Sequence, residues 1–583
     1  MILIESSLIL LAVLVAFVFP NVGGRWLAPL ERGFLQLGRR RGLSVVVVLL
    51  TALVVRVALL PVEPIPRPGV HDEFAYLLAG DTFAHGRLSN STHPMWTHFE
   101  TFYVNQKPTY GSMFYPAQGL FLAAGQVIFG HPFWGVWLSA GLMCAAICWM
   151  LQAWLPPSWA LLGGLLAVVR LGSFSYWANS YWGGAVPAIG GALVLGALPR
   201  IKQHQRVRDS LLMGLGLAIL ANSRPYESLF FCLPVAGLLL VFMLGKEKPQ
   251  RPLQNIVVPI GLVLVFTIAA MGYYFWRTTG SPINTPYLIN TKTYNPVPYF
   301  PWQTLKPVPE YHHAVMENLY MRAVVDNYNL ARLRPGGLAL IKATRIWAFY
   351  FGLVLTFPIL MLGLTLPYGM SFVEISPKIR FLLLVSLTTI LGLLFPLYFN
   401  PHYAAPLAAV VYALVLQAMQ HLRRWKWHAN PTGLAMCRAV PAICVLLLFA
   451  RALSPRIHVP VPTEFPQTWA SPQSQMLDRS KLQGELKEYA EHHLVIVRYQ
   501  PSHDPLGGEW VYNDADIDNS KTVWARDMGT AQNEELIKYF KNRRVWLLEP
   551  DETPPKLSPY QPNGADSTSL ANGHTEMRGT GFK

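Results

Sequence analysis

Two adjacent carboxylates, Asp72 and Glu73, follow His71 just past the end of an apolar segment. If that segment crosses a membrane, the two charges stand at the membrane boundary. Charged groups there are costly and indicate a functional site. A carboxylate in this position can remove a proton from a hydroxyl group, which is general-base chemistry. We therefore predict Asp72 and Glu73 as the catalytic residues.

A general base in a group-transfer reaction needs a partner that stabilises the leaving group. Arginine suits a leaving phosphate because its planar guanidinium binds two phosphate oxygens at once. Arg224 is the strongest candidate for this role, and short polar segments that join apolar spans supply further ones. The full set of predicted substrate-binding residues is His71, Tyr76, Lys107, Arg170, Arg224, Tyr226, Glu227, His402 and Tyr403.

Several of these residues also have structural alternatives. Asp72 is a favoured residue type for the start of a helix, and residues 74–85 read as one. Arg224 could extend to the membrane interface or pair with Glu227. Interfacial anchoring is the alternative for His71, His402 and Tyr403.

The composition is that of a polytopic membrane protein. Of the 583 residues, 52% are hydrophobic and only 14% charged. Lysine and arginine outnumber aspartate and glutamate by 47 to 32, but they gather in short loops between apolar segments. The positive-inside rule produces this distribution, so the basic surplus does not indicate nucleic-acid binding. The five cysteines also lie in apolar segments, which favours buried hydrophobic roles.

Hydrophobic patterning predicts an all-α polytopic membrane protein with about 12 spans. The first segment carries Glu5 and no basic residues before it, so we expect a retained helix rather than a signal peptide. An arginine-rich loop then precedes the second span, which places Asp72 on the far side of the membrane. The expected spans lie near residues 4–20, 43–61, 133–153, 158–172, 183–199, 209–222, 229–245, 255–276, 338–366, 380–399, 404–420 and 434–453.

We expect five regions along the chain. Residues 1–42 form a membrane helix and a basic cytoplasmic loop. Residues 43–453 form the catalytic membrane domain, with external loops at about 63–132 and 277–337. The first of these loops contains an interfacial helix, Pro116 to Phe129, which is too short to span. A linker at 454–475 leads to a small extracytoplasmic α/β domain at 476–553, and the tail at 554–583 is expected to be disordered.

These motifs resemble those of the GT-C superfamily of membrane glycosyltransferases. The resemblance rests on Asp72-Glu73 after the first exit helix, and on the stretch from Lys107-Pro108 to Phe129 with its Tyr115-Pro116-Ala117. The chain looks most like the protein O-mannosyltransferase and lipid A aminoarabinose transferase group. That likeness implies a polyprenyl-phosphate sugar donor and an inverting transfer. It places Asp72 where the family has its base, with Glu73 as its partner.

Neither the resemblance nor the residues predict a metal or another cofactor. Some members of the superfamily bind a divalent metal through an acid in the next external loop, but here the loop Gly172–Gly183 has only Asn179 as a polar candidate. Metal dependence is therefore doubtful, and the metal-independent branch fits better. The run Asp514–Asp518 begins like a calcium loop, but Asn519 and Ala525 stand where glycine and glutamate are required.

The leading hypothesis is a transferase of hexosyl or pentosyl groups in the plasma membrane, the bacterial inner membrane. It would move a sugar from a polyprenyl phosphate to a lipid, glycan or protein acceptor of the cell envelope, on the extracytoplasmic face. A transporter or flippase of lipid-linked glycans is the alternative. That class predicts buried charges at mid-membrane, whereas Arg56, a charge within an expected span, lies near the exit of that span. A structural assembly subunit is a third reading, but it gives the acidic pair no role.

Overall fold

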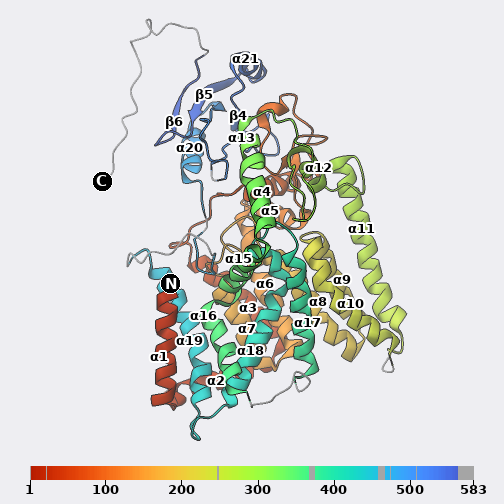
Figure 1. Ribbon diagram of the computed structural model, residues 1–583, viewed down its shortest axis with the longest axis vertical. Coiled ribbons are helices and arrows are strands. Elements are labelled where there is room, and N and C mark those ends of the chain that lie inside the picture. Colours follow the sequence, from red (N-terminus) through yellow and green to blue (C-terminus); the bar gives the residue numbers. More distant parts are fainter. Residues whose placement is uncertain are drawn as a thin grey trace.

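The computed structural model describes residues 2–21, 23–245, 249–366, 375–456, 467–472, 474–506 and 508–561. Parts of the expected linker and of the expected tail, and the basic segment 246–248, lie outside these residues. A bundle of long helices forms one end of the molecule and a small sheet domain forms the other (Figure 1). Helices α4 and α5 lie between them.

Among the described residues, nine helical segments are long and apolar enough to cross a membrane, so this is a multi-pass membrane protein. Each expected span corresponds to a helix. Three of those helices have only 17, 14 and 15 residues and fall short of the spanning length, so a count of twelve is not confirmed: α1 (Ile2–Val18), α7 (Pro157–Arg170) and α9 (Val207–Ala221). The nine longer segments are α3 (Arg41–Ala58), α6 (Phe133–Trp154), α8 (Ala185–His204), α10 (Pro225–Leu244), η2 (Leu253–Val257) with α11 (Val258–Thr279), α15 (Pro335–Ile346) with η4 (Trp347–Phe351) and α16 (Gly352–Thr365), α17 (Pro377–Leu394), η6 (Pro401–Leu407) with α18 (Ala408–Arg424), and α19 (Thr432–Leu453).

The bundle has a buried centre and a lipid-facing rim. Most of α8 and α18 is buried, whereas little of α11 is buried and many of its apolar side chains are exposed. Arg56, the charge near the end of α3, is buried and donates to the carbonyl oxygens of Ala178, Glu63 and Pro64. Its charge is thus satisfied by the loops at the end of the bundle nearest α4.

The arginine-rich segment expected as a loop is instead a helix, α2 (Gly24–Arg39). It lies at the end of the bundle opposite the sheet domain (Figure 1). Its Glu31 pairs with Arg438 at 2.8 Å and Arg423 at 3.5 Å, which fixes α2 against α18 and α19. The basic residues and the apolar face coexist because the helix is amphipathic.

The first external loop contains both expected helices. They are α4 (His71–Ala84) and α5 (Pro116–Phe129), with η1 (Trp96–Phe99), β1 (Val104–Asn105) and β2 (Gly111–Ser112) between them. Helix α5 begins at Pro116, which has no N–H to leave unsatisfied, and ends at Gly130 in the left-handed region with φ 77°. A side chain on Gly125 would collide with the backbone nitrogen of Gly135, so α5 lies directly on α6.

The second external loop also has helical structure. It contains α12 (Pro286–Tyr294), α13 (Ala314–Glu317), η3 (Asn318–Val324) and α14 (Val325–Leu333). Helices α13, η3 and α14 follow one another without a break. This rod runs from the sheet domain toward the bundle (Figure 1).

The C-terminal domain is a small α/β unit, as the sequence predicts. It consists of α20 (Leu477–Glu488), β3 (His492–Val497), β4 (Thr522–Arg526), α21 (Thr530–Tyr539), β5 (Arg543–Glu549) and β6 (Lys556–Pro559). The strand order is β4-β3-β5-β6, with β3 parallel to β4 and β5 and with β6 antiparallel to β5. The sequence predicts strands at 493–499 and 544–548, which correspond to β3 and β5, and it does not predict β4. Strand β6 lies in the segment that the sequence predicts to be disordered, and that part of the prediction is wrong.

Candidate active site

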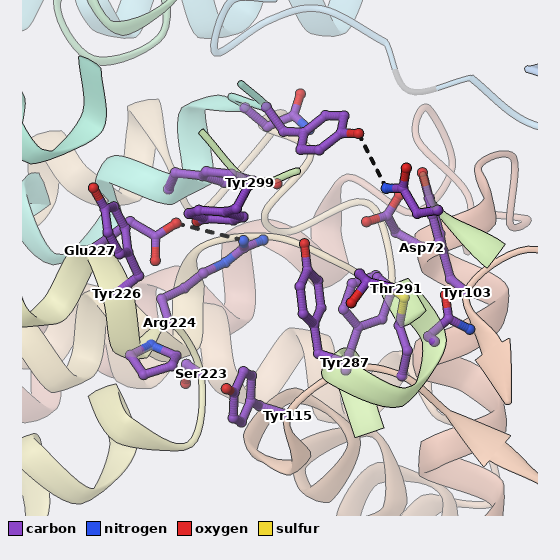
Figure 2. Close-up of a pocket in the computed structure, with 18 of the residues that line it drawn as sticks. Asp72, Tyr103, Tyr115, Ser223, Arg224, Tyr226, Glu227, Tyr287, Thr291 and Tyr299 are labelled. Atoms are coloured by element: carbon purple, nitrogen blue, oxygen red, sulfur yellow. Dashed lines mark hydrogen bonds and ion pairs between the residues drawn. The ribbon is translucent and has the colours of Figure 1, made fainter. Parts of the chain in front are cut away.

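A cavity of about 310 Å³ lies between the helix bundle and the external loops. It takes its lining from α4, from the segment before α5, from the start of α10, from the second external loop and from the segment that leads into α18. Of the described residues, the charged ones in its lining are Asp72, Arg224 and Glu227. Figure 2 shows Arg224 reaching into this cavity, with Glu227 on one side and Asp72 on the other.

Tyrosine dominates the remainder of the lining. Tyrosine hydroxyls can bond sugar oxygens, while their rings offer apolar faces. The lining tyrosines are Tyr76, Tyr103, Tyr115, Tyr226, Tyr287, Tyr299, Tyr320, Tyr398 and Tyr403. Five of the predicted binding residues thus line the cavity: Tyr76, Arg224, Tyr226, Glu227 and Tyr403.

Asp72 lies in the first turn of α4, where the positive end of the helix favours a carboxylate. Among the described residues, no other side chain forms a hydrogen bond or ion pair with it. Burial raises the pKa of Asp72 to about 6, against the attraction of the Arg224 guanidinium. The carboxylate is thus ionised at neutral pH yet basic enough to take a proton.

Glu73 occupies a different environment from its neighbour. Its side chain is fully buried and does not line the cavity. One carboxylate oxygen accepts from the backbone N–H groups of Gly69 (2.8 Å) and Val70 (3.3 Å), and the other from Tyr181 (3.0 Å). Glu73 therefore fixes the start of α4 to the loop that precedes α8.

Arg224 is held by three side chains. The guanidinium lies 3.9 Å over the ring of Tyr403, and its Nη1 is 3.9 Å from Oε1 of Glu227. Its Nη2 donates to Nε2 of His402. Because Pro225 starts α10 directly after it, Arg224 stands at the N-terminus of that helix, where an anion is also favoured.

His402 links Arg224 to the buried loop before α8. Arginine can only donate, so Nε2 of His402 accepts and Nδ1 carries the proton. Nδ1 then donates to the hydroxyl of Tyr176 at 3.0 Å, and the backbone N–H of His402 donates to the same oxygen. His402 itself is buried and does not line the cavity.

Like His402, three further predicted binding residues lie outside the cavity. The ammonium of Lys107 is 3.9 Å from the ring centre of Trp96. Arg170 pairs with Glu5 at 3.2 Å and donates to the carbonyl oxygen of Phe351, which joins α7 to α1 and to the end of η4. His71, the third, is bonded to the C-terminal domain.

The bonds of His71 tie α4 to that domain. Its Nε2 donates to the carbonyl oxygen of Pro505 at 2.7 Å, and its Nδ1 accepts from the hydroxyl of Tyr512 at 3.0 Å. Burial lowers the pKa of His71 to about 4, so the ring is neutral near pH 7.

Sequence reasoning missed the contribution of the second external loop. Tyr287, Asn290 and Tyr299 line the cavity, and Tyr320 does so from η3. The available signal was the richness of residues 277–337 in Tyr, Asn and Pro, which marked the segment without selecting residues.

A groove of about 630 Å³ adjoins the cavity and shares Val324, Tyr398 and Asn400 with it. Apolar side chains of α14 and α15 line it together with three cations, Arg334, Lys342 and Arg345. The ammonium of Lys342 donates to carbonyl oxygens at the end of α17, including that of Leu393 at 3.0 Å.

In the part of the chain that the structure describes, no three His, Cys, Asp or Glu side chains form a group that could hold a metal ion. Asn179 donates to the carbonyl oxygens of Ser173 and Ser175 within its own loop.

The sequence matches no protein-family model and no curated protein. Comparison of structures finds similar folds. The oligosaccharyltransferase of Archaeoglobus fulgidus, tethered to an acceptor peptide, is 13% identical over 86% of this chain and 68% of its own, with a TM-score of 0.46. ArnT from Cupriavidus metallidurans bound to undecaprenyl phosphate is 11% identical over 87% of this chain and 92% of its own, with a TM-score of 0.43. The likeness describes helical layout and does not bear on activity.

Proposed function

We propose that this protein is an integral-membrane glycosyltransferase that moves a sugar from a polyprenyl phosphate to an acceptor hydroxyl. One observation carries the proposal: Asp72, a carboxylate with no side-chain partner in the part of the chain that the structure describes, and Arg224, a positioned guanidinium, face one cavity at the edge of a membrane helix bundle. The acceptor belongs to a lipid, a glycan or a protein.

The two groups divide the chemistry between them. Asp72 takes the proton from the acceptor hydroxyl as its oxygen forms a bond to the anomeric carbon. On the opposite side of the sugar, the bond from that carbon to the phosphate oxygen breaks, and the phosphate leaves with the electron pair. Arg224 stabilises the charge that develops on this phosphate. Attack opposite to departure inverts the anomeric centre.

The charge of the cavity favours a monophosphate donor. Arg224 is its one lining cation among the described residues, and Glu227 offsets part of that charge. A diphosphate would bring additional negative charge beside Glu227 without another cation to match it. A single phosphate fits the single guanidinium.

The adjoining groove is the proposed site of the donor lipid. Apolar residues such as Leu338 and Ile341 would contact the isoprene chain. The groove shares Tyr398 with the active-site cavity, so a lipid in the groove could present its sugar there.

We further propose that the cavity faces the extracytoplasmic side of the plasma membrane, the bacterial inner membrane, and that the transferred unit is a hexosyl or pentosyl group. The basic helix α2 lies at the opposite end of the bundle, as the positive-inside rule requires for this orientation (Figure 1).

The purified protein in detergent tests this proposal with radiolabelled polyprenyl-phosphate sugars and a panel of envelope lipids and peptides. We expect free polyprenyl phosphate and glycosylated acceptor to form in equal amounts. In proteoliposomes, movement of intact donor between leaflets without cleavage would instead identify a flippase.

A further inference from the structure

A second cavity, of about 530 Å³, lies between the C-terminal domain and helix α13. It lies where the parallel strands β3 and β4 end, at Val497 and Arg526, and where α21 begins, at Thr530. Ligands of sheets with parallel strands bind at the carboxyl ends of those strands. The cavity shares no lining residue with the active-site cavity.

The guanidinium groups that line this cavity are already paired with carboxylates. Nε of Arg498 donates to Asp527, and Nη2 of Arg526 donates to Glu509 at 2.8 Å. Asp527 also accepts from the N–H of Gly529 at 3.1 Å, so a negative charge stands at the start of α21. An anionic ligand would therefore find both guanidinium groups already paired with carboxylates. It would also be repelled by the carboxylate of Asp527 at the start of α21. This arrangement favours a neutral ligand.

The groups that remain for a ligand are mainly hydroxyls, amides and imidazoles. Asn318 stands on the α13 side with Nε2 of His312, whose Nδ1 already donates to Glu100 at 2.8 Å. Thr530 and Gln532 stand on the α21 side. The ring of Tyr499 lies in the same lining and is 4.0 Å from the ring of His503. Sugar hydroxyls both donate and accept hydrogen bonds, which matches such a mixture, and the volume lies in the ordinary range for small-ligand sites.

Two buried polar atoms of lining residues also have no hydrogen-bond partner within the described protein. They are Nη1 of Arg526, a donor, and Nε2 of His503, whose other ring nitrogen donates to Asp551 at 2.6 Å. Buried polar atoms are normally satisfied by the protein, by water or by a ligand. Both atoms are covered by their neighbours, so a ligand in the cavity can bond to them only if the side chains around them shift.

A continuous helical rod connects this cavity to the active site. Helix α13 and Asn318 line the second cavity, and η3 then supplies Tyr320 and Val324 to the active-site cavity. Tyr499 packs against the aromatic cluster that contains Tyr320. A molecule held in the second cavity is thus adjacent to a wall of the reaction site.

We propose that the second cavity binds a neutral saccharide that forms part of the acceptor. The assignment to the acceptor rests on the proposed function, whereas saccharide binding itself does not. The site would hold an acceptor glycan on the C-terminal domain while its reacting hydroxyl reaches Asp72.

Binding of the full-length protein in detergent to immobilised glycans tests the proposal. Neutral hexose- and N-acetylhexosamine-terminated oligosaccharides serve as probes, and phosphorylated or sialylated glycans serve as anionic comparators. Thr530→Trp would fill the cavity from an exposed position, and Asn318→Ala would remove an amide. Glu534→Trp, one turn further along α21 and outside the lining, is the matched control.

We expect wild type and Glu534→Trp to bind neutral glycans, and Thr530→Trp and Asn318→Ala to bind them at least tenfold more weakly. Asp72→Asn should bind like wild type while it loses transfer, so failure of catalysis and failure of this site give different results. Absence of neutral-glycan binding, a preference for anionic glycans, or binding that Thr530→Trp leaves unchanged would each overturn the proposal.

Discussion

Nε2 of His71 lies 2.7 Å from the carbonyl oxygen of Pro505, so the residue before Asp72 is bonded directly to the C-terminal domain. The two partners are 434 positions apart in the chain. Helix α4 thereby joins the membrane bundle to the sheet domain. The position of the proposed base depends on this junction.

Replacement of His71 should loosen the junction and weaken the protein. His71→Ala leaves the carbonyl of Pro505 and the hydroxyl of Tyr512 without their partner, which costs about 1–3 kcal/mol for each group that stays buried and unpaired. We expect a lower unfolding temperature and a fall in kcat. His71→Gln, which can still donate, should recover part of both, and equal loss in the two variants would contradict this role.

The same histidine predicts acid sensitivity. Its pKa is lowered to about 4 in the folded protein, so between the unfolded value near 6.5 and pH 4 the unfolded state binds more protons. Stability should therefore fall as the pH drops through this window. Thermal unfolding of wild type and His71→Gln at pH 7 and pH 4.5 measures this loss of stability. The variant should lose less stability on acidification than wild type.

The pH dependence of transfer should report Asp72. With a pKa raised to about 6, the carboxylate is ionised above that pH and protonated below it. We expect kcat/KM to fall about tenfold per pH unit below pH 6. A profile that stays flat down to pH 4.5 would show that no group with this pKa acts as the base.

Arg224 should affect the leaving phosphate. Arg224→Ala should lower kcat by about 10²–10³-fold, the usual effect of losing one donor to a developing charge. Arg224→Lys keeps the positive charge without the planar guanidinium, so its kcat should lie between those of wild type and Arg224→Ala. Arg322→Ala, an exposed arginine on η3 outside the cavity, is the control and should retain full activity.

His402 and Tyr176 should act through Arg224. His402→Ala removes the acceptor for Nη2 and should lower kcat about tenfold, while His402→Gln retains an acceptor oxygen and should restore much of the rate. Tyr176→Phe removes the oxygen that orients the imidazole and should resemble His402→Ala. Failure of glutamine to improve on alanine would show that the contact with Arg224 is not what matters.

Features that depend on neighbouring residues in the sequence could be predicted, whereas features that depend on distant residues could not. Helix α5 could be placed because its ends are marked locally, by Pro116 and by Gly130. Asp72 and Arg224 could be selected because charged residues beside apolar spans are costly and indicate a functional site. The different environments of Asp72 and Glu73 could not be predicted from the neighbouring sequence, because the partners of Glu73 include Tyr181, 108 positions away.

The remaining features depend on tertiary contacts. Tyr287 and Tyr299 reach the cavity through the path of the second loop, which no local pattern encodes. Strand β4 has five residues, all buried, and an apolar run this short is ambiguous in sequence. Helix α2 was missed because its arginines indicated a loop, although its other face is apolar.

The most direct test of the account is single-turnover transfer by Asp72→Asn with saturating polyprenyl-phosphate sugar. Asp81→Asn, the other aspartate of α4 and outside the cavity, is the matched control. We predict that Asp72→Asn binds the donor like wild type and transfers at least 10²-fold more slowly, in line with loss of a general base, while Asp81→Asn transfers at close to the wild-type rate. Transfer by Asp72→Asn at the wild-type rate would contradict the assignment of Asp72 as the base.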